Sequence, residues 1–446
     1  MIKEIKTNLS AFEIFSIFKD EDHALILDSS LNSNLGRFSI ICFNPFDVFC
    51  FKLQDNNNPF EILREKLNKN KIKNDTNLPF IGGAVGYFSY DLFARIFDLN
   101  LKNENYIDGF DMYFGFYDFA LVFDHFENKF YFASSNINLE RENEAYKFVK
   151  EKLQANKDDF KANDNFNFEK MEFRSKLSKK SYFDKISKIK NYIENGDVYQ
   201  INFTWLMEGK TKLNSFEIYK RLRETSPCPF GAFLDFGGIS ILSNSPERFL
   251  QCQNNIVKTS PIKGTIKRLK DKIQDKINKQ ILLQSQKDRA ELLMIVDLER
   301  NDLSKVCEFP SVEVDELFKL ESYENVHHLV ATIKGKLRKD CDLIDLLLAT
   351  FPGGSISGAP KLRALETINE LELNNRNAYT GALGYLGFDG NLDLNILIRS
   401  IIKKDENLFF QVGGGITWDS KDRDEYEECL SKASAILKAL NADFKA

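Results

Sequence analysis

The strongest indication of the fold is the stretch Ala232-Phe233-Leu234-Asp235-Phe236-Gly237-Gly238-Ile239-Ser240-Ile241-Leu242. Two short apolar runs flank a Gly-Gly pair, and this arrangement is typical of an antiparallel hairpin with a tight turn. Similar short runs continue toward Thr265, so we predict an antiparallel meander over residues 231–267.

Strand-like and helix-like segments lie in clusters along the rest of the chain. Short strands are predicted at residues 24–27, 120–123, 130–132 and 198–204, and again between 382 and 412. Apolar residues at helical spacing predict a helix over 182–193 that ends near Gly196, one long helix over 274–300, and a final helix over 423–440. Because strands and helices do not alternate strictly, the pattern favours an α+β fold, with antiparallel sheets packed under helices, over a parallel sheet.

The chain is long enough for two closely associated domains. It has 446 residues, and the segment from Gln154 to Asn167 is polar and has no apolar period. We therefore predict an amino-terminal domain over residues 1–150, a linker over 151–175 and a second domain over 176–446.

The composition argues against several classes of function. The net charge is −5, which gives no reason to expect nucleic-acid binding through bulk electrostatics. No apolar run reaches the roughly 18 residues of a membrane span, and the first residues do not resemble a signal sequence. Seven scattered cysteines without a Cys-x-x-Cys pair indicate reduced thiols in a cytoplasmic protein. Four histidines without metal-ligand spacing argue against a zinc site.

Two pairs of carboxylates stand out by their spacing. Asp288 and Glu291 are three residues apart in the predicted long helix, and Glu425 and Glu428 are three apart in the last helix. This separation places each pair on one helical face. Two such faces on opposite sides of a cleft would suit Mg²⁺, which binds oxygen ligands. The ion would take its remaining ligands from water and an anionic substrate. Taken singly, either pair is more simply explained as a solvated surface.

Glycine-rich turns are a second kind of candidate. Residues 351–361 lead into a helix for which Ser357 is the expected N-cap and Pro360 lies in the first turn. Backbone N–H groups at such a helix start could hold a carboxylate. Residues 413–415, three glycines, end a strand just before the last helix. The alternative is that both segments are simple tight connections.

Several single side chains could take part in catalysis or in substrate binding. Arg399 lies toward the end of a very apolar strand predicted over 394–402, so if buried it needs either a substrate carboxylate or an internal salt bridge. His328 and Tyr379, each taken alone, are more simply explained as core residues. Lys263 is different, because an exposed charge in its strand-like run packs poorly, and burial would free its amine as a nucleophile. Glu247 lies in the same meander, where a hairpin could bring it to the same cleft as Lys263.

Together these stretches resemble the chorismate-utilising enzyme family, which includes the anthranilate synthase large subunit, aminodeoxychorismate synthase component I, and the isochorismate and salicylate synthases. The resemblance covers nearly the whole chain. It is carried by residues 245–249, 261–265, 288–291, 294–302, 326–330, 353–361 and 413–428. In the first third, residues 79–88 resemble the amino-terminal half of the two amine-forming members.

The resemblance implies an α-β-β-α layered sandwich of two mostly antiparallel sheets flanked by helices, the anthranilate synthase component I fold, with the active site between the sheets. By position, Glu291 and Glu428 match direct Mg²⁺ ligands, while Asp288 and Glu425 act beside them largely through water. Asp288 departs from the glutamate of anthranilate synthases and has a shorter side chain. Positions around the substrate ring and its carboxylates are matched by Gln200, His328, Ser355, Tyr379, Arg399, Gly414 and Gly415.

Two positions narrow the implied reaction. Lysine at position 263 marks the aminodeoxychorismate synthases, whereas anthranilate synthases carry alanine there. Gln200 stands where isochorismate and salicylate synthases carry a water-activating lysine, which argues against hydroxylation. The implied reaction converts chorismate and ammonia to 4-amino-4-deoxychorismate, a precursor of para-aminobenzoate and folate. It would proceed through a covalent Lys263 intermediate, with Glu247 as general acid.

The resemblance also implies partners and a second ligand. No glutaminase segment is recognisable in the chain, so ammonia is expected from a glutamine amidotransferase subunit in a heterodimer. Asp28, Ser29 and Pro227 fall where family members bind tryptophan, with core packing as the alternative. Two rival functions are an anthranilate synthase large subunit and a non-catalytic, glutaminase-binding subunit. The carboxylates and Lys263 argue against the second rival.

Overall fold

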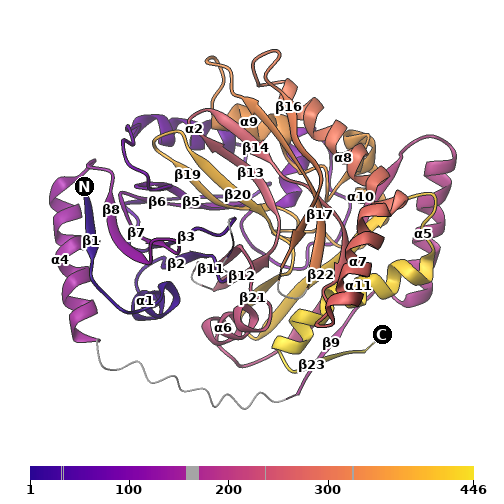
Figure 1. Ribbon diagram of the computed structural model, residues 1–446, viewed down its shortest axis with the longest axis horizontal. Coiled ribbons are helices and arrows are strands. Elements are labelled where there is room, and N and C mark those ends of the chain that lie inside the picture. The colour runs from indigo at the N-terminus through magenta and orange to yellow at the C-terminus, as the bar shows by residue number, and fades with distance from the viewer. Residues whose placement is uncertain (32, 34, 157–169, 237, 324–325, 446) are drawn as a thin grey trace.

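The computed structural model describes residues 1–446 apart from 32, 34, 157–169, 237, 324–325 and 446. Within the described residues, two large sheets pack face to face and helices cover their outer surfaces (Figure 1). The predicted α+β sandwich with α-β-β-α layers is therefore confirmed.

The first sheet is built from both ends of the chain. Its described strands, in spatial order, are β1 (Ile2–Ile5), β8 (Lys129–Ser134), β7 (Phe119–Asp124), β3 (Phe38–Cys42), β2 (Leu25–Asp28), β11 (Phe230–Asp235), β12 (Ile239–Ser245), β21 (Ser400–Lys404), β22 (Asn407–Ile416), β10 (Gln200–Lys210), β9 (Met171–Arg174) and β23 (Ala442–Lys445), with β18 (Gly358–Ala359) paired to β10. The hairpin predicted around residues 232–242 is confirmed as β11 and β12, although Gly237 lies outside the described residues. Strand β2 pairs with β11, which joins the first third of the chain to the remainder.

The prediction of one meander over 231–267 is wrong, because β11 and β12 lie in the first sheet and the strands of this segment after residue 247 lie in the second sheet. The described strands of the second sheet, in spatial order, are β15 (Ile262–Lys267), β17 (Val326–Lys336), β14 (Ile256–Thr259), β13 (Arg248–Gln253), β20 (Leu392–Ile396), β19 (Ala382–Gly387), β5 (Gly83–Phe88), β6 (Met112–Tyr117) and β4 (Asp47–Phe51), with β16 (Glu313–Ser322) paired to β17. Here β5 pairs with β19, so residues before 150 and after 176 share this sheet too. The linker predicted over 151–175 stays a prediction, because residues 157–169 lie outside the described part.

Helices pack on the outer face of each sheet. The described helices are α1 (Ala11–Phe18), α2 (Pro59–Lys69), η1 (Tyr90–Leu92), α3 (Phe93–Ile96), α4 (Leu139–Ala155), α5 (Lys179–Glu194), α6 (Ser215–Thr225), α7 (Lys272–Gln284), α8 (Gln286–Ser304), α9 (Leu343–Thr350), α10 (Lys361–Leu371) and α11 (Asp422–Ala439). In α5, Tyr182, Ile186 and Ile189 form the buried stripe that the sequence spacing predicts. Burial of such a side chain contributes about 1.5–3 kcal/mol.

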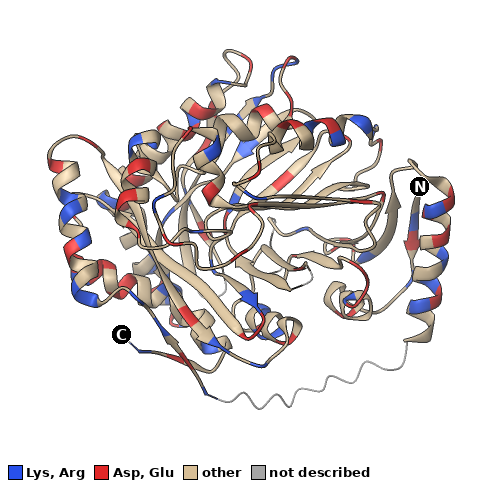
Figure 2. Ribbon diagram, turned by 180° about the vertical axis from the view of Figure 1, so that it is seen from behind, with Lys and Arg blue, Asp and Glu red and all other residues tan. Residues whose placement is uncertain are grey.

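Three apolar cores correspond to the layers. One lies between the first sheet and helices that include α1, α5 and α11, as Phe15 and Ile436 show. A second lies between the other sheet and α2, α8 and α9, as Leu292 and Leu347 show. The third, with Val85, fills the space between the sheets. Charges of both signs alternate along the outer helices, α4 among them (Figure 2). No helix in the described ranges is long and apolar enough to cross a membrane.

The prediction of one helix over 274–300 is wrong. The helix divides at Ser285, whose φ of −62° and ψ of 108° are extended. The Ser285 hydroxyl accepts a hydrogen bond from the backbone N–H of Asp288 at 3.2 Å, so it caps a new helix, α8. Asp288 therefore lies in the first turn of α8.

The predicted start of the helix after the 351–361 loop is also wrong. Pro360 is the N-cap of α10, and Ser357 lies three residues earlier. The backbone around Ser357 is engaged by β10 instead: its carbonyl accepts from Asn202 N at 2.8 Å, and β18 pairs with the start of β10. The loop thus adds a short strand to the first sheet before the helix begins.

Arg399 is not inside a strand, contrary to prediction. The run 394–402 divides into β20, in the second sheet, and β21, in the first. Arg399 lies at the crossing with φ +53°, a conformation that breaks strand pairing. The crossing places the arginine between elements of the two sheets. The strand predicted over 198–204 begins at Gln200, two residues later than predicted.

Candidate active site

Lys263 lies on β15 at an irregular position of the sheet. The register between β15 and β17 shifts between Lys263 and Thr265, where Gly264 has φ +77°. A Cβ at position 264 would lie 2.9 Å from Asp288 Cγ. Glycine therefore lets α8 approach β15 closely. The approach brings the first turn of α8 beside the strand that carries the lysine.

Lys263, Ser355 and Glu247 form one connected group. Lys263 Nζ donates a hydrogen bond to the Ser355 carbonyl at 3.1 Å, and the Ser355 hydroxyl donates to Glu247 Oε1 at 2.8 Å. Glu247 is only 6% exposed. Three residues that the sequence marks in separate stretches therefore meet at one place.

Burial governs the protonation chemistry of this group. It lowers the pKa of the Lys263 amine, while the carboxylates of Glu291 and Glu247 oppose that change. It raises the pKa of Glu247, against the hydrogen bond from Ser355 and the charge of Lys263. The amine is therefore easier to deprotonate, and the carboxyl harder to ionise, than in water. These are the shifts that a nucleophile and a general acid need.

The two carboxylate pairs face each other from α8 and α11. Lys287 Nζ lies 3.9 Å from Glu291 Oε1 on its own helix and 3.3 Å from Glu425 Oε1 on α11. Lys432 Nζ lies 2.8 Å from Glu428 Oε1. One ammonium thus reaches a carboxylate of each helix, which shows that the side chains of Glu291 and Glu425 lie near each other.

The donor chemistry of these helices fits a hard divalent cation. The Glu291 side chain is mostly buried, burial raises its pKa, and its Oε1 has no hydrogen-bond partner among the described residues. No group of three or more His, Cys, Asp or Glu side chains in the described ranges is already gathered around a cation position. Lysines neutralise the carboxylates in this arrangement, and Asp288, Glu291, Glu425 and Glu428 stay predicted ligands of Mg²⁺.

The glycines at the end of β22 lie between the lysine and the carboxylates. A Cβ at Gly415 would lie 2.0 Å from Gln200 Nε2 and 3.6 Å from Lys263 Nζ, and a Cβ at Gly414 would lie 3.4 Å from Glu425 Oε2. A side chain at position 415 would clash with Gln200, and one at position 414 would contact the carboxylate of Glu425. Gln200 is 1% exposed, and its Oε1 lacks a hydrogen-bond partner within the described part of the chain.

A cavity of about 110 Å³ lies next to this group and is lined by Thr265, His328 and Arg399, among others. His328 Nδ1 is 2.8 Å from Thr265 Oγ1, and burial, together with the charge of Arg399, lowers the pKa of His328 to about 4. Burial also lowers the pKa of Arg399, with Tyr379 opposing. No carboxylate of a described residue pairs with Arg399. The arginine is thus available to a substrate carboxylate.

The residues predicted to bind tryptophan divide between two cavities. Asp28 and Ser29 line a cavity of about 340 Å³ between the sheets, whereas Pro227 lines the smaller cavity beside His328. Asp28 Oδ2 accepts from Arg223 Nε at 2.7 Å, but Asp28 Oδ1 has no hydrogen-bond partner among the described residues. A buried acceptor at a cavity suits an amino group of a ligand.

Sequence reasoning missed the basic and structural partners of these residues. Lys287 and Lys432 lie four residues from Glu291 and Glu428 on the same helices, a spacing at which side chains meet. This spacing is the signal that could have revealed them. The role of Arg376, described below, depends on backbone carbonyls of distant segments, and only its pairing with Glu372, four residues earlier, has a local pattern.

Comparison with known proteins identifies the family of the chain. The chain belongs to the family of chorismate binding enzymes, whose family model matches residues 23–438. Anthranilate synthase component 1 of Acetivibrio thermocellus is 38% identical over 456 residues, covering 96% of this chain and 92% of that protein. Aminodeoxychorismate synthase component 1 of Escherichia coli (strain K12) is 39% identical over 385 residues, covering 86% and 82%.

A solved structure agrees with the sequence relatives. Anthranilate synthase component I from Streptococcus pneumoniae TIGR4 has a TM-score of 0.80 and 32% identity to this chain, covering 91% of it and 93% of that chain. The protein is therefore a chorismate-utilising enzyme of the class that contains aminodeoxychorismate synthase and anthranilate synthase component I.

Proposed function

We propose that this chain is the chorismate-aminating component of an aminodeoxychorismate synthase, which converts chorismate and ammonia to 4-amino-4-deoxychorismate for para-aminobenzoate and folate synthesis. The observation that carries the proposal is Lys263. Its amine donates to the Ser355 carbonyl at 3.1 Å, and the hydroxyl of the same serine donates to the Glu247 carboxyl. Burial lowers the pKa of the amine. An amine in this setting is suited to nucleophilic catalysis.

The proposed chemistry has two steps. The neutral amine of Lys263 forms a bond to ring carbon C2, the two ring double bonds shift, and the C4–O bond breaks. Glu247 gives its proton to the departing hydroxyl, which leaves as water. Ammonia then forms a bond to C4, the double bonds shift back, and the bond from C2 to Lys263 breaks. The lysine thus divides one difficult displacement into two easier ones.

The other site residues bind and orient the substrate in this proposal. Mg²⁺, when bound, would neutralise and orient the substrate carboxylates. Glu291 and Glu428 would hold it directly, and Asp288 and Glu425 largely through water. Arg399 would bind a substrate carboxylate at the smaller cavity, because no carboxylate of a described residue pairs with its guanidinium.

The ammonia is proposed to come from a glutamine amidotransferase subunit that forms a heterodimer with this chain. The relatives are named component 1, which supports a second component. Ammonia is a small neutral nucleophile, so a partner that releases it at the site would supply this reaction without a covalent link between the chains.

A second candidate function is anthranilate synthase component I, which the Acetivibrio and Streptococcus relatives favour by name. The test is product identification with chorismate, Mg²⁺ and an ammonium salt. The proposal expects 4-amino-4-deoxychorismate by mass spectrometry, and a predominance of fluorescent anthranilate would contradict it. Absence of turnover at saturating ammonia and Mg²⁺ would instead favour a non-catalytic, glutaminase-binding subunit.

We expect Mg²⁺ to raise the melting temperature of the protein, and Glu291→Gln to remove most of that increase. At a hundredfold excess over Kd, binding stabilises the folded state by about 2.7 kcal/mol. Lys287→Met should strengthen Mg²⁺ binding, because it removes an ammonium that competes for Glu291 and Glu425. Asp297→Asn, at an exposed position on the same helix, is the matched control. An Mg²⁺ shift that Glu291→Gln leaves intact would contradict the assignment.

We propose that the larger cavity binds tryptophan through Asp28. L-Tryptophan should raise the melting temperature, and Asp28→Asn should weaken this effect, because the free Asp28 Oδ1 would lose the charge that attracts an ammonium group. Asp118→Asn, also buried and paired to Arg141, controls for the loss of a buried carboxylate. Tryptophan without effect at millimolar concentration would favour plain core packing.

A further inference from the structure

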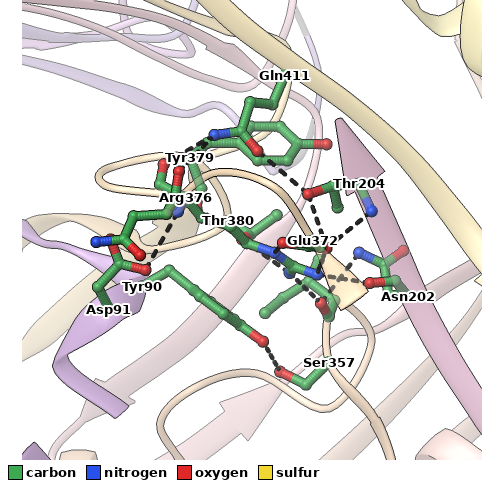
Figure 3. A network of polar contacts seen from close by, with 12 residues as sticks. Tyr90, Asp91, Asn202, Thr204, Ser357, Glu372, Arg376, Tyr379, Thr380 and Gln411 are labelled. Carbon is green, nitrogen blue, oxygen red and sulfur yellow. Dashed lines mark hydrogen bonds and ion pairs between the residues drawn. The ribbon is translucent and has the colours of Figure 1, made fainter. Parts of the chain in front are cut away.

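Arg376, which follows α10 in the chain, is the centre of a buried polar network (Figure 3). Its side chain is 1% exposed and forms a two-pronged ion pair with Glu372, at 2.9 Å from Nε and 2.7 Å from Nη2. The remaining N–H groups donate to Ile356 O at 2.8 Å, Asn202 O at 2.5 Å and Thr380 Oγ1 at 3.2 Å. All five guanidinium N–H groups therefore have acceptors.

The network holds the loop that carries Ser355. The next residue, Ile356, offers its carbonyl to Arg376 Nη1 and also to Asn202 Nδ2, at 3.0 Å. Ser355 itself makes both contacts that join the amine of Lys263 to the candidate acid. Any displacement of the Ile356 carbonyl would therefore move those two contacts together.

The same guanidinium reaches two more segments of the site. Thr380 follows Tyr379 and has φ +58°, which threonine rarely adopts. Its hydroxyl accepts from Arg376 and donates to the Tyr379 carbonyl at 2.6 Å. Glu372 Oε1 accepts from both the backbone N–H and the hydroxyl of Thr204 on β10, at 2.8 and 2.9 Å. One ion pair thus fixes the Ser355 loop, the Tyr379 turn and β10 relative to one another.

Stability alone is a weak explanation for this ion pair. Removing two charges from water costs free energy, and apolar residues of similar volume often stabilise a core as well or better. A network in which every donor is satisfied instead specifies one geometry. The ring of Tyr90, 4.3 Å from Arg376 Cζ, packs against the guanidinium and limits its movement.

We propose that Arg376, paired with Glu372, is a positioning residue for the chorismate reaction. It holds the Ser355 loop so that the Lys263 amine and the Glu247 carboxyl meet the substrate in one fixed arrangement. The inference rests on the proposed function for the roles of Lys263 and Glu247.

The test is Arg376→Lys, which keeps the charge but loses the planar fork. We expect kcat for chorismate consumption to fall about a hundredfold, as a misplacement of about 1 Å does. KM for chorismate should change little, because Arg376 does not line the substrate cavity. The rate of covalent adduct formation without ammonia should fall to the same extent as kcat.

Arg141→Lys is the matched control. Arg141 pairs with the buried Asp118 and with the Asn44 carbonyl, and it lies on α4, far along the molecule from α8 and α11 (Figure 1). We expect Arg141→Lys to lower the melting temperature about as much as Arg376→Lys does, but to leave kcat unchanged. If Arg376→Lys does not fold, the double variant Arg376→Gln/Glu372→Gln removes both charges together and must show the same loss of kcat.

A folded Arg376→Lys enzyme with wild-type kcat would overturn the inference. So would equal losses of kcat in Arg376→Lys and Arg141→Lys, because that result would show a general effect of stability. Total chorismate consumption is the readout, so the comparison stays valid whichever product the wild-type enzyme makes. Product identity in the wild type reports separately on the proposed function.

Discussion

Replacement of Lys263 by methionine should reduce formation of 4-amino-4-deoxychorismate by about a thousandfold, within the range for loss of a single catalytic group. Methionine fills a similar volume beside Ser355 but has no amine, so ammonia must displace the C4 hydroxyl directly. We expect kcat to carry the loss, with KM for chorismate nearly unchanged, because Arg399 and the Mg²⁺ proposed to be held by the carboxylates would still bind the substrate. Steady-state kinetics with an ammonium salt provides the measurement.

Lys267→Met is the matched control for this substitution. Lys267 is on the same strand, β15, and its side chain is exposed. The control should retain wild-type kcat. Near-normal amination by Lys263→Met would show that the lysine is dispensable and would favour direct attack by ammonia.

Replacement of Glu247 by glutamine should reduce kcat by about 10² to 10⁴, the usual contribution of a positioned general acid. Glutamine keeps the acceptor for the Ser355 hydroxyl but cannot protonate the departing C4 hydroxyl. Glu313→Gln, at an exposed position on β16, is the matched control and should be as active as the wild type. A loss of kcat below about fivefold would be too small for a positioned general acid.

The pH profile of Glu247→Gln gives an independent check. The reaction needs Lys263 neutral, which favours high pH, and Glu247 protonated, which favours low pH. Their pKa values are shifted toward each other, down for the amine and up for the carboxyl, both by burial. The wild-type kcat should therefore rise and then fall with pH. Without the carboxyl only the lysine requirement remains, so kcat of the variant should rise and then level off. A retained fall at high pH would assign the acid role to another group.

Local patterns predicted the elements of the fold better than their boundaries. The β11–β12 hairpin follows from two apolar runs around a turn, because the pairing between these two strands joins residues that are close together in the chain. The pairing of β2 with β11 joins residues some 200 positions apart and has no local signal. The break at Ser285 was missed because Leu282 and Leu292 both remain buried on either side of it. The spacing of apolar residues therefore continues across the break between α7 and α8.

The site could be predicted where function demands a particular residue type. Lys263 and Glu247 are chemically unusual in their stretch, and the structure connects them through Ser355. The interpretation of Arg399 as part of a strand was wrong, because a single left-handed residue redirects the chain from one sheet to the other. Arg376 acts through the carbonyls of Ile356 and Asn202, which any residue type would provide. Contacts to backbone leave no trace in sequence.

The central claim is the covalent bond between Lys263 and the substrate ring. Intact-protein mass spectrometry after incubation with chorismate and Mg²⁺, without ammonia, tests it most directly. We predict an added mass equal to chorismate minus water, located on Lys263 by peptide mapping and absent from Lys263→Met. A wild-type enzyme that makes 4-amino-4-deoxychorismate with ammonia but forms no adduct without it, or an adduct that persists in Lys263→Met, would contradict the account.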